Sequence, residues 1–161
     1  MIDDLLYLIR RTRQHHAIEH ATLHVMSKRP DSGHLSGLSD PFGFTIFGET
    51  DLEKVRRGVG DALLRLQAGE EQLAIHPNCG TNLVTTGLLV TLAALAAGTK
   101  HNPLERLVTT LLWVLPMIVA GKVLGMRLQQ FTTLAQVADR WVIDIYPVRV
   151  GSLRAYRVIF E

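Results

Sequence analysis

Two long apolar segments constrain the fold of this 161-residue chain more than any other feature. The first covers residues 83–98, and the second covers residues 107–126, where Lys122 is the one charged side chain. An α-helix needs roughly 17–25 residues to cross a bilayer, and each segment is close to the lower end of this range. A short polar break with Pro103 and Arg106 separates them. The pattern therefore predicts a helical hairpin through the lipid bilayer, with a buried hairpin in a soluble domain as the alternative.

The composition agrees with either alternative and excludes other classes of protein. Apolar residues make up 47% of the chain and charged residues 20%. The formal charge of +2 is small, and no basic patch is interleaved with aromatic side chains, so we expect no nucleic-acid partner. Cys79 is the one cysteine, which excludes an internal disulfide. Residues 1–4 are acidic where a signal peptide needs a basic segment, so we expect both termini in the cytoplasm.

A long helix is expected at the N-terminus. Asp3 or Asp4 can cap it, and Arg29-Pro30 would stop it. At about 100° per residue, one face of this helix is apolar and continues into histidines. That face consists of Ile2, Leu5, Leu6, Ile9, His16, His20, Leu23 and His24. The histidines are thus expected to be buried, where an imidazole needs a partner.

The helix carries the motif His16-Ala17-Ile18-Glu19-His20, the reverse of the common zinc-protease signature. His16 and His20 stand one turn apart, so both can bind one ion, and Glu19 projects beside them. The alternative without a metal is that these are core histidines hydrogen-bonded to the backbone. Because His24 continues the spacing, metal binding is favoured; His24 itself is a reserve ligand, and His15 points away from the face.

A second group of candidate ligands follows in His76-Pro77-Asn78-Cys79. Residues 71–75 are expected to form a short strand that leads to it. An imidazole and a soft thiolate across a proline turn are a zinc-type donor pair. Cys79 also lies at the expected start of the next helix, whose dipole would favour the thiolate. The alternatives are a buried thiol and a turn shaped by Pro77.

The remaining segments predict a small sheet with one packed helix. Residues 30–42 have the glycines and prolines of a loop, in which His34 is expected to be solvated. Thr50 and Glu53 form a capping box for a helix that ends at Gly69. Strands are expected at residues 44–48, 71–75, 142–146 and 153–160. The predicted fold is α+β: residues 1–81 form the metal-site region, residues 82–127 form an inserted transmembrane hairpin, and residues 128–161 form a C-terminal helix end and the strands that complete the sheet.

Two motifs resemble known bacterial proteins. The pattern His16-x-x-Glu19-His20-x-Thr22, followed by His76-Pro77-x-Cys79-Gly80-Thr81 and an apolar helix, resembles the YqhQ-like membrane proteins, described as predicted metal-dependent enzymes. Their lysine after the second histidine is Ala21 here. Over its full length the chain looks more like another uncharacterised bacterial family, a domain of unknown function that also shares the loop of residues 39–43. The resemblance implies one site in a protein of the bacterial inner (cytoplasmic) membrane, formed by His16, Glu19, His20, His76 and Cys79.

Two functions are compatible with these residues. In the first, the protein is a membrane-anchored zinc hydrolase: His16 and His20 bind Zn²⁺ with His76 or Cys79, and Glu19 is the catalytic general base. In the second, all four ligands close a structural site in a non-enzymatic accessory protein of a larger membrane complex. A third alternative is a hydrogen-bonded core without metal. Small residues in the hairpin would also allow a homo-oligomer.

Overall fold

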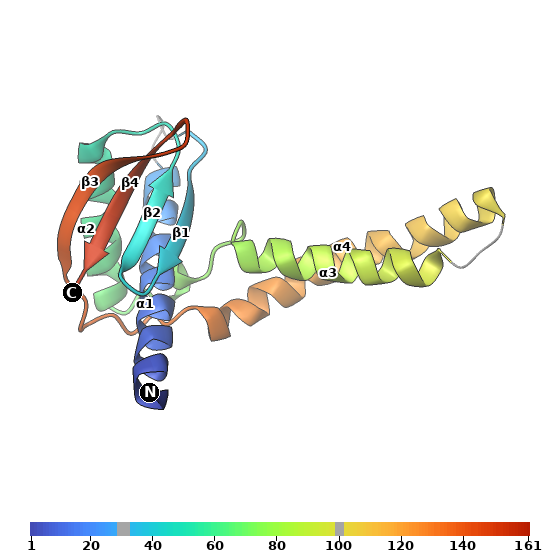
Figure 1. The fold of residues 1–161 in the computed structure, drawn as a ribbon, viewed down its shortest axis with the longest axis horizontal. Coiled ribbons are helices and arrows are strands. Elements are labelled where there is room, and N and C mark those ends of the chain that lie inside the picture. The colour runs from blue at the N-terminus through green and yellow to red at the C-terminus, as the bar shows by residue number, and fades with distance from the viewer. Residues whose placement is uncertain (29–32, 99–101) are drawn as a thin grey trace. The chain divides into compact units, whose positions relative to one another are not determined.

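The computed structural model describes residues 1–28, 33–98 and 102–161, and it confirms a mixed fold of helices and a small sheet. A long N-terminal helix, a four-stranded antiparallel sheet and two apolar helices are its main parts (Figure 1). The chain forms two compact units, Met1–His76 with Phe131–Glu161 and Pro77–Gln130. In chain order the elements are α1 (Ile2–Ser27), β1 (Ser36–Asp40), β2 (Gly43–Phe47), α2 (Leu52–Gln67), the 3-10 helix η1 (Glu71–Ala74), α3 (Gly80–Ala97), α4 (Pro103–Thr132), β3 (Val142–Val150) and β4 (Leu153–Phe160).

In the first unit, α1 and α2 cover one face of the sheet (Figure 1). The strand order is β1-β2-β4-β3, and every neighbouring pair is antiparallel. Phe44 and Ile46 of β2 are fully buried against the helices, and Phe44 pairs in register with Val158 of β4. From the helices, Ile18, Val55 and Val59 fill the other side of this core. The two layers therefore enclose one hydrophobic core, with α1 at its centre.

Helix α1 is buried over only part of its length, and the prediction of a continuous buried stripe is wrong at its N-terminal end. The stripe residues Ile2, Leu5, Leu6 and Ile9 are 46–72% exposed, whereas burial begins at Gln14. Periodicity shows which face of a helix is apolar, but it does not show how far the neighbouring elements extend along it. The N-cap is Met1, and Asp3 and Asp4 lie in the first turn, where the helix dipole favours acidic residues.

The sheet differs from the prediction at one edge. Residues 71–75 were expected to form a strand, but η1 occupies most of this segment and buries Leu73 and Ala74. The edge strand is instead β1, within the segment interpreted as a loop. Its sequence has one large apolar side chain, Leu38, so it lacks a β pattern; pairing with β2 across a tight turn makes it a strand.

Two smaller features also differ from the sequence-based expectations. The N-cap of α2 is Asp51 rather than Thr50, because the Asp51 side chain accepts a hydrogen bond from the Lys54 amide. Strand β3 continues through Pro147 to Val150. The sheet tolerates this proline because β3 is an edge strand.

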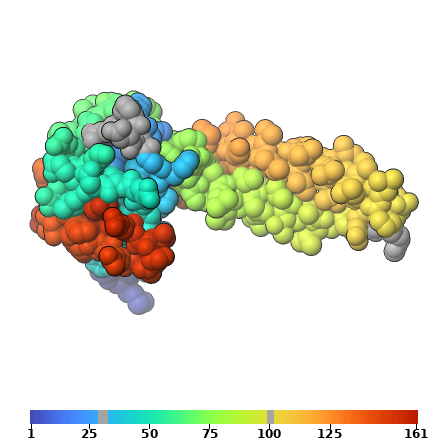
Figure 2. All heavy atoms as spheres, turned by 90° about the horizontal axis from the view of Figure 1, so that it is seen from above, coloured from blue at the N-terminus to red at the C-terminus, as the bar shows by residue number. Residues whose placement is uncertain are grey.

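The second unit is a helical hairpin. Helices α3 and α4 have 18 and 30 residues and are long and apolar enough to cross a membrane. They pack side by side in both views (Figures 1 and 2). A Cβ added at Gly121 would lie 2.6 Å from Cα of Thr86, and one at Gly125 would lie 2.7 Å from Cα of Asn82. Small residues thus allow close approach of the helices, while most of their large apolar side chains remain exposed. This exposure favours the membrane alternative over a core hairpin.

Candidate metal centre

The predicted histidines lie in the part of α1 that packs on the core, where His20 is buried, as expected, but His16 and His24 are half-buried. His16 and His20 stand one helical turn apart, with ring centroids separated by 4.3 Å. His20 is 1% exposed and Glu19 4% exposed, because η1 and β1 pack against this turn of the helix. Polar side chains buried to this degree need partners, and those partners determine what each imidazole can do.

Backbone carbonyls determine which nitrogen of His16 and His20 carries the proton. Nδ1 of His20 lies 2.7 Å from the carbonyl oxygen of Ala74, and Nδ1 of His16 lies 3.0 Å from that of Thr132. A carbonyl oxygen only accepts, so Nδ1 donates in both residues and Nε2 carries the lone pair. Metal-binding histidines are oriented in this way, with one ring nitrogen on a carbonyl and the other on the ion.

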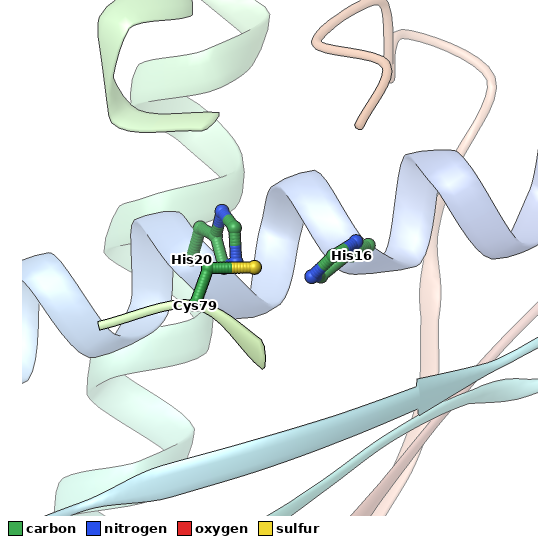
Figure 3. A group of neighbouring side chains, drawn as sticks. All are labelled: His16, His20 and Cys79. Carbon is green, nitrogen blue, oxygen red and sulfur yellow. The ribbon is translucent and has the colours of Figure 1, made fainter. Parts of the chain in front are cut away.

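Cys79 completes a group of three donors. The ligand atoms of His16, His20 and Cys79 lie within 4.8 Å of one another (Figure 3). In a tetrahedral zinc site, bonds of about 2.0 Å to nitrogen and 2.3 Å to sulfur place these atoms roughly 3.5 Å apart. A shift of about an ångström would therefore bring the donors to an ion. In the sequence, Pro77 and Asn78 alone separate Cys79 from His76.

His76 and His24 lie beside this group. The His76 ring is 5.7 Å from the ring of His20 and 4.6 Å from that of His24, measured between centroids. Burial, and then the nearby charges of His24 and His20, lower the pKa of His76 to about 4. His76 is therefore neutral at physiological pH, as a ligand must be. His24 differs from the other histidines, because its Nε2 lies 2.7 Å from the carbonyl of Ile75 and is thus its donating nitrogen.

Comparison with known proteins identifies the family. The model described as "Domain of unknown function (DUF6391)" matches residues 11–145. The chain belongs to this family. An uncharacterised protein of Picosynechococcus sp. is 36% identical to it over 136 residues, which cover 79% of the chain. The chain spans 60% of the length of that relative. No solved structure matches the chain.

The expected membership of an uncharacterised bacterial family is thus confirmed, and the DUF6391 match extends over the histidines, Cys79 and both apolar helices. The match also includes the loop of residues 39–43, whose role the structure explains. The Asp40 carboxylate accepts hydrogen bonds from the amides of Phe42 and Gly43 and forms an ion pair of 2.7 Å with Arg157. Burial opposes ionisation of Asp40, but Arg157 and these amides outweigh it and lower the pKa of the carboxyl group.

Strand β1 fixes two side chains of α1. The Ser39 hydroxyl donates a hydrogen bond to the Glu19 carboxylate, and Gly37 leaves the room that this carboxylate occupies. The backbone carbonyl of Asp40 lies 2.9 Å from Nδ1 of His15. His15 is fully buried, stacks on Phe160, and has a pKa lowered chiefly by burial. It is a core histidine outside the group of donors.

The structure therefore brings His16, His20 and Cys79 together, places His76 next to them, and holds Glu19 on the β1 side of the helix. Glu19 and His76 are not among the three grouped donors of the described residues. His34 is exposed, as expected. The sequence assigned no role to Ser39 or Gly37, although Ser39 is the first residue of the loop motif of residues 39–43, which was the available signal.

Proposed function

We propose that this protein is anchored in a membrane by α3 and α4 and binds a zinc-type ion through His16, His20 and Cys79. The observation that carries the proposal is the orientation of the imidazoles. Two backbone carbonyls hold Nδ1 of His16 and His20 as donors, which makes Nε2 the lone-pair nitrogen of each ring, and the ligand atoms of both residues lie within 4.8 Å of the thiol of Cys79. Two imidazoles and one thiolate form a donor set that suits zinc.

We further propose that the protein is a hydrolase with Glu19 as general base. Three protein ligands leave one coordination position for water, and zinc lowers the pKa of bound water to about 7. Glu19 projects from the turn between the two histidines, and Ser39 holds its carboxylate in a buried position. A fixed carboxylate within reach of a metal-bound water could accept a proton from it and pass the proton to a leaving group. The YqhQ-like resemblance of the two motifs agrees with a metal-dependent enzyme.

The second candidate is a structural metal in an accessory protein of a membrane complex. The contact of His76 with His20 favours it, because His76 as fourth ligand would close the site. Closing the site would pin α1 to the turn before α3. The two candidates differ in whether the ion keeps a position for water.

For the membrane, we propose that residues 82–127 cross the bacterial inner membrane as a hairpin and that residues 1–81 and 128–161 form a cytoplasmic domain. Cysteine accessibility in intact cells tests this topology. A cysteine introduced at Ser152, in the β3–β4 turn, should react with a membrane-impermeant maleimide only after lysis, in a Cys79→Ser background. Labelling of this cysteine in intact cells would contradict the cytoplasmic placement.

The metal proposal is tested by elemental analysis of the full chain, purified in detergent without chelator or affinity tag. We expect about one equivalent of zinc, and large losses in His16→Ala and Cys79→Ser. His34→Ala is the matched control, since it removes an exposed histidine. Less than a tenth of an equivalent of metal would contradict both candidate functions.

Substitution with Co²⁺ distinguishes the two candidates without a known substrate. If the ion keeps a water, the visible spectrum should change with pH near the pKa of that water, and Glu19→Gln should shift this transition while Co²⁺ is retained. A pH-independent spectrum that changes in His76→Ala would instead show a closed site. That result would contradict the hydrolase proposal and support the structural one.

A further inference from the structure

A cavity of about 310 Å³ lies in the hairpin unit and includes Cys79 in its wall. The other walls come from the segment before α3, from the first two turns of α3 and from α4. They include Pro77, Asn82, Leu83, Thr86 and Lys122. The cavity therefore combines apolar surface, a hydroxyl group and one cation beside a proposed metal ligand.

Packing inside the hairpin fixes the shape of this cavity. The Asn82 amide group donates to the carbonyl of Pro77 at 2.7 Å, and its oxygen accepts from the Gln129 side chain at 2.9 Å. Asn82 and Gln129 are both buried, and Gly125 provides the space for Asn82. Because the polar atoms of Asn82 are already paired, it serves as a rigid wall, and the other polar groups in the walls are those of Asn78, Cys79, Thr86 and Lys122.

Lys122 brings a positive charge into an apolar environment. The segment of residues 77–130 contains one acidic residue, Glu105, and among the described residues no acidic side chain pairs with Lys122. Its neighbour Gly121 packs on Thr86, so Lys122 lies roughly 9 Å along the helix axis from the start of α3. In a bilayer an ammonium without a counter-charge at this depth has a free-energy cost, which an anionic partner would reduce. Its flexible stem can carry the ammonium toward the end of the hairpin where Cys79 lies.

We propose that this cavity binds the anionic headgroup of an amphiphile. The Lys122 ammonium pairs with a phosphate group, and the apolar walls at Leu83 and Pro77 contact the first part of the acyl chains. The positive end of the α3 dipole adds to the attraction for an anion. Cys79 belongs both to the cavity wall and to the proposed metal site, so a role of this ligand as substrate rests on the proposed function. Binding in the cavity does not depend on a metal.

The test measures binding to the full chain in detergent, after metal removal with a chelator. The probes are dihexanoyl phosphatidic acid, dihexanoyl phosphatidylcholine and inorganic phosphate, and calorimetry gives each dissociation constant. We expect phosphatidic acid to bind at least tenfold more tightly than either other probe. Lys122→Met should weaken its binding at least tenfold, because methionine removes the charge-assisted hydrogen bond, while Lys122→Arg should stay within about threefold, because arginine retains one. Arg127→Met is the matched control, since it removes an exposed charge of α4 outside the cavity.

Three results would overturn the proposal. Equal affinity of wild type and Lys122→Met for phosphatidic acid would show that the cavity does not bind the headgroup. An equal loss in Arg127→Met would show that only the surface charge of the hairpin matters. Inorganic phosphate bound as tightly as phosphatidic acid would show a free anion rather than an amphiphile. Circular dichroism confirms that each variant keeps its helices. Because the protein is free of metal in this experiment, a negative result would not contradict the proposed metal centre. A protein that binds no metal could likewise still bind the headgroup.

Discussion

Gly37 offers a direct test of how β1 holds Glu19. A Cβ at position 37 would lie 2.5 Å from Cδ and 2.6 Å from Cγ of Glu19, well inside van der Waals contact. In Gly37→Ala the Glu19 side chain must therefore move by about an ångström and weaken its hydrogen bond with Ser39. Overpacking of a buried site costs about 1–3 kcal/mol, and a hydrogen bond to a charged group contributes about 1.5–3 kcal/mol. We expect Gly37→Ala to destabilise the protein by about 2 kcal/mol.

The double variant with Glu19→Ala isolates this contact. In the Glu19→Ala background the three atoms nearest to the new Cβ are gone, and the smaller conformational entropy of the unfolded chain should make Gly37→Ala neutral or stabilising by up to about 1 kcal/mol. The coupling free energy between the two positions is thus roughly 2 kcal/mol. Gly60→Ala is the control, because a Cβ there would meet nothing within 4 Å.

The assay is urea unfolding of metal-free protein in detergent, followed by the fluorescence of Trp141. A Trp113→Phe background removes the tryptophan of α4, so the signal reports on the unit that contains β3. If Gly37→Ala costs the same free energy with and without the Glu19 side chain, the coupling is zero. Glu19 would then not be held in the space beside β1, and its role as a positioned base would lose its structural support.

Three further predictions test other parts of the structure. The pKa of Asp40 is lowered in the folded protein, so its ionised form stabilises the fold above pH 3.8, and this stabilisation is lost as the pH falls through the lower folded value. Arg157→Met should reduce this loss of stability in urea unfolding between pH 5 and 2. An unchanged pH dependence would refute the ion pair. Gly121→Leu should separate α3 from α4 and lower the thermal midpoint of the hairpin by several degrees, whereas Gly87→Leu, which faces open space, should not; equal effects would argue against close packing at Gly121. His76→Ala should retain at least half of the bound zinc if three ligands suffice, and loss of nearly all metal would assign His76 as a required ligand.

The sequence predicted the main elements because their patterns are long. The helical spacing of α1 and the length of two apolar runs identify these elements without any knowledge of their neighbours. Strand β1 and the helix η1 are short, and tertiary contacts decide their conformation: the five residues of β1 pair with β2, and Leu73 and Ala74 of η1 enter the core. The exposure of the first turns of α1 could not be predicted, because it depends on how far the elements packed against α1 extend along the helix.

The sequence could point to the residues of the candidate site, but not to the contacts that hold their side chains. The motif places His16 and His20 on one face by helical geometry alone, and a turn near a proline suggested Cys79. What makes the imidazoles suitable ligands comes from carbonyls far away in sequence: Ala74 lies 54 positions from His20, and Thr132 lies 116 positions from His16. Ser39 reaches Glu19 from a strand that the sequence pattern does not show. Such contacts depend on tertiary packing, which no local pattern encodes.

The central claim is that two imidazoles and one thiolate bind a single zinc-type ion. Zinc K-edge X-ray absorption of the full chain, purified as isolated, measures this donor set directly. The account predicts about one sulfur at roughly 2.3 Å and two imidazole nitrogens at roughly 2.0 Å, with loss of the sulfur in any metal that Cys79→Ser retains. A zinc shell without sulfur, or one unchanged by Cys79→Ser, would contradict it.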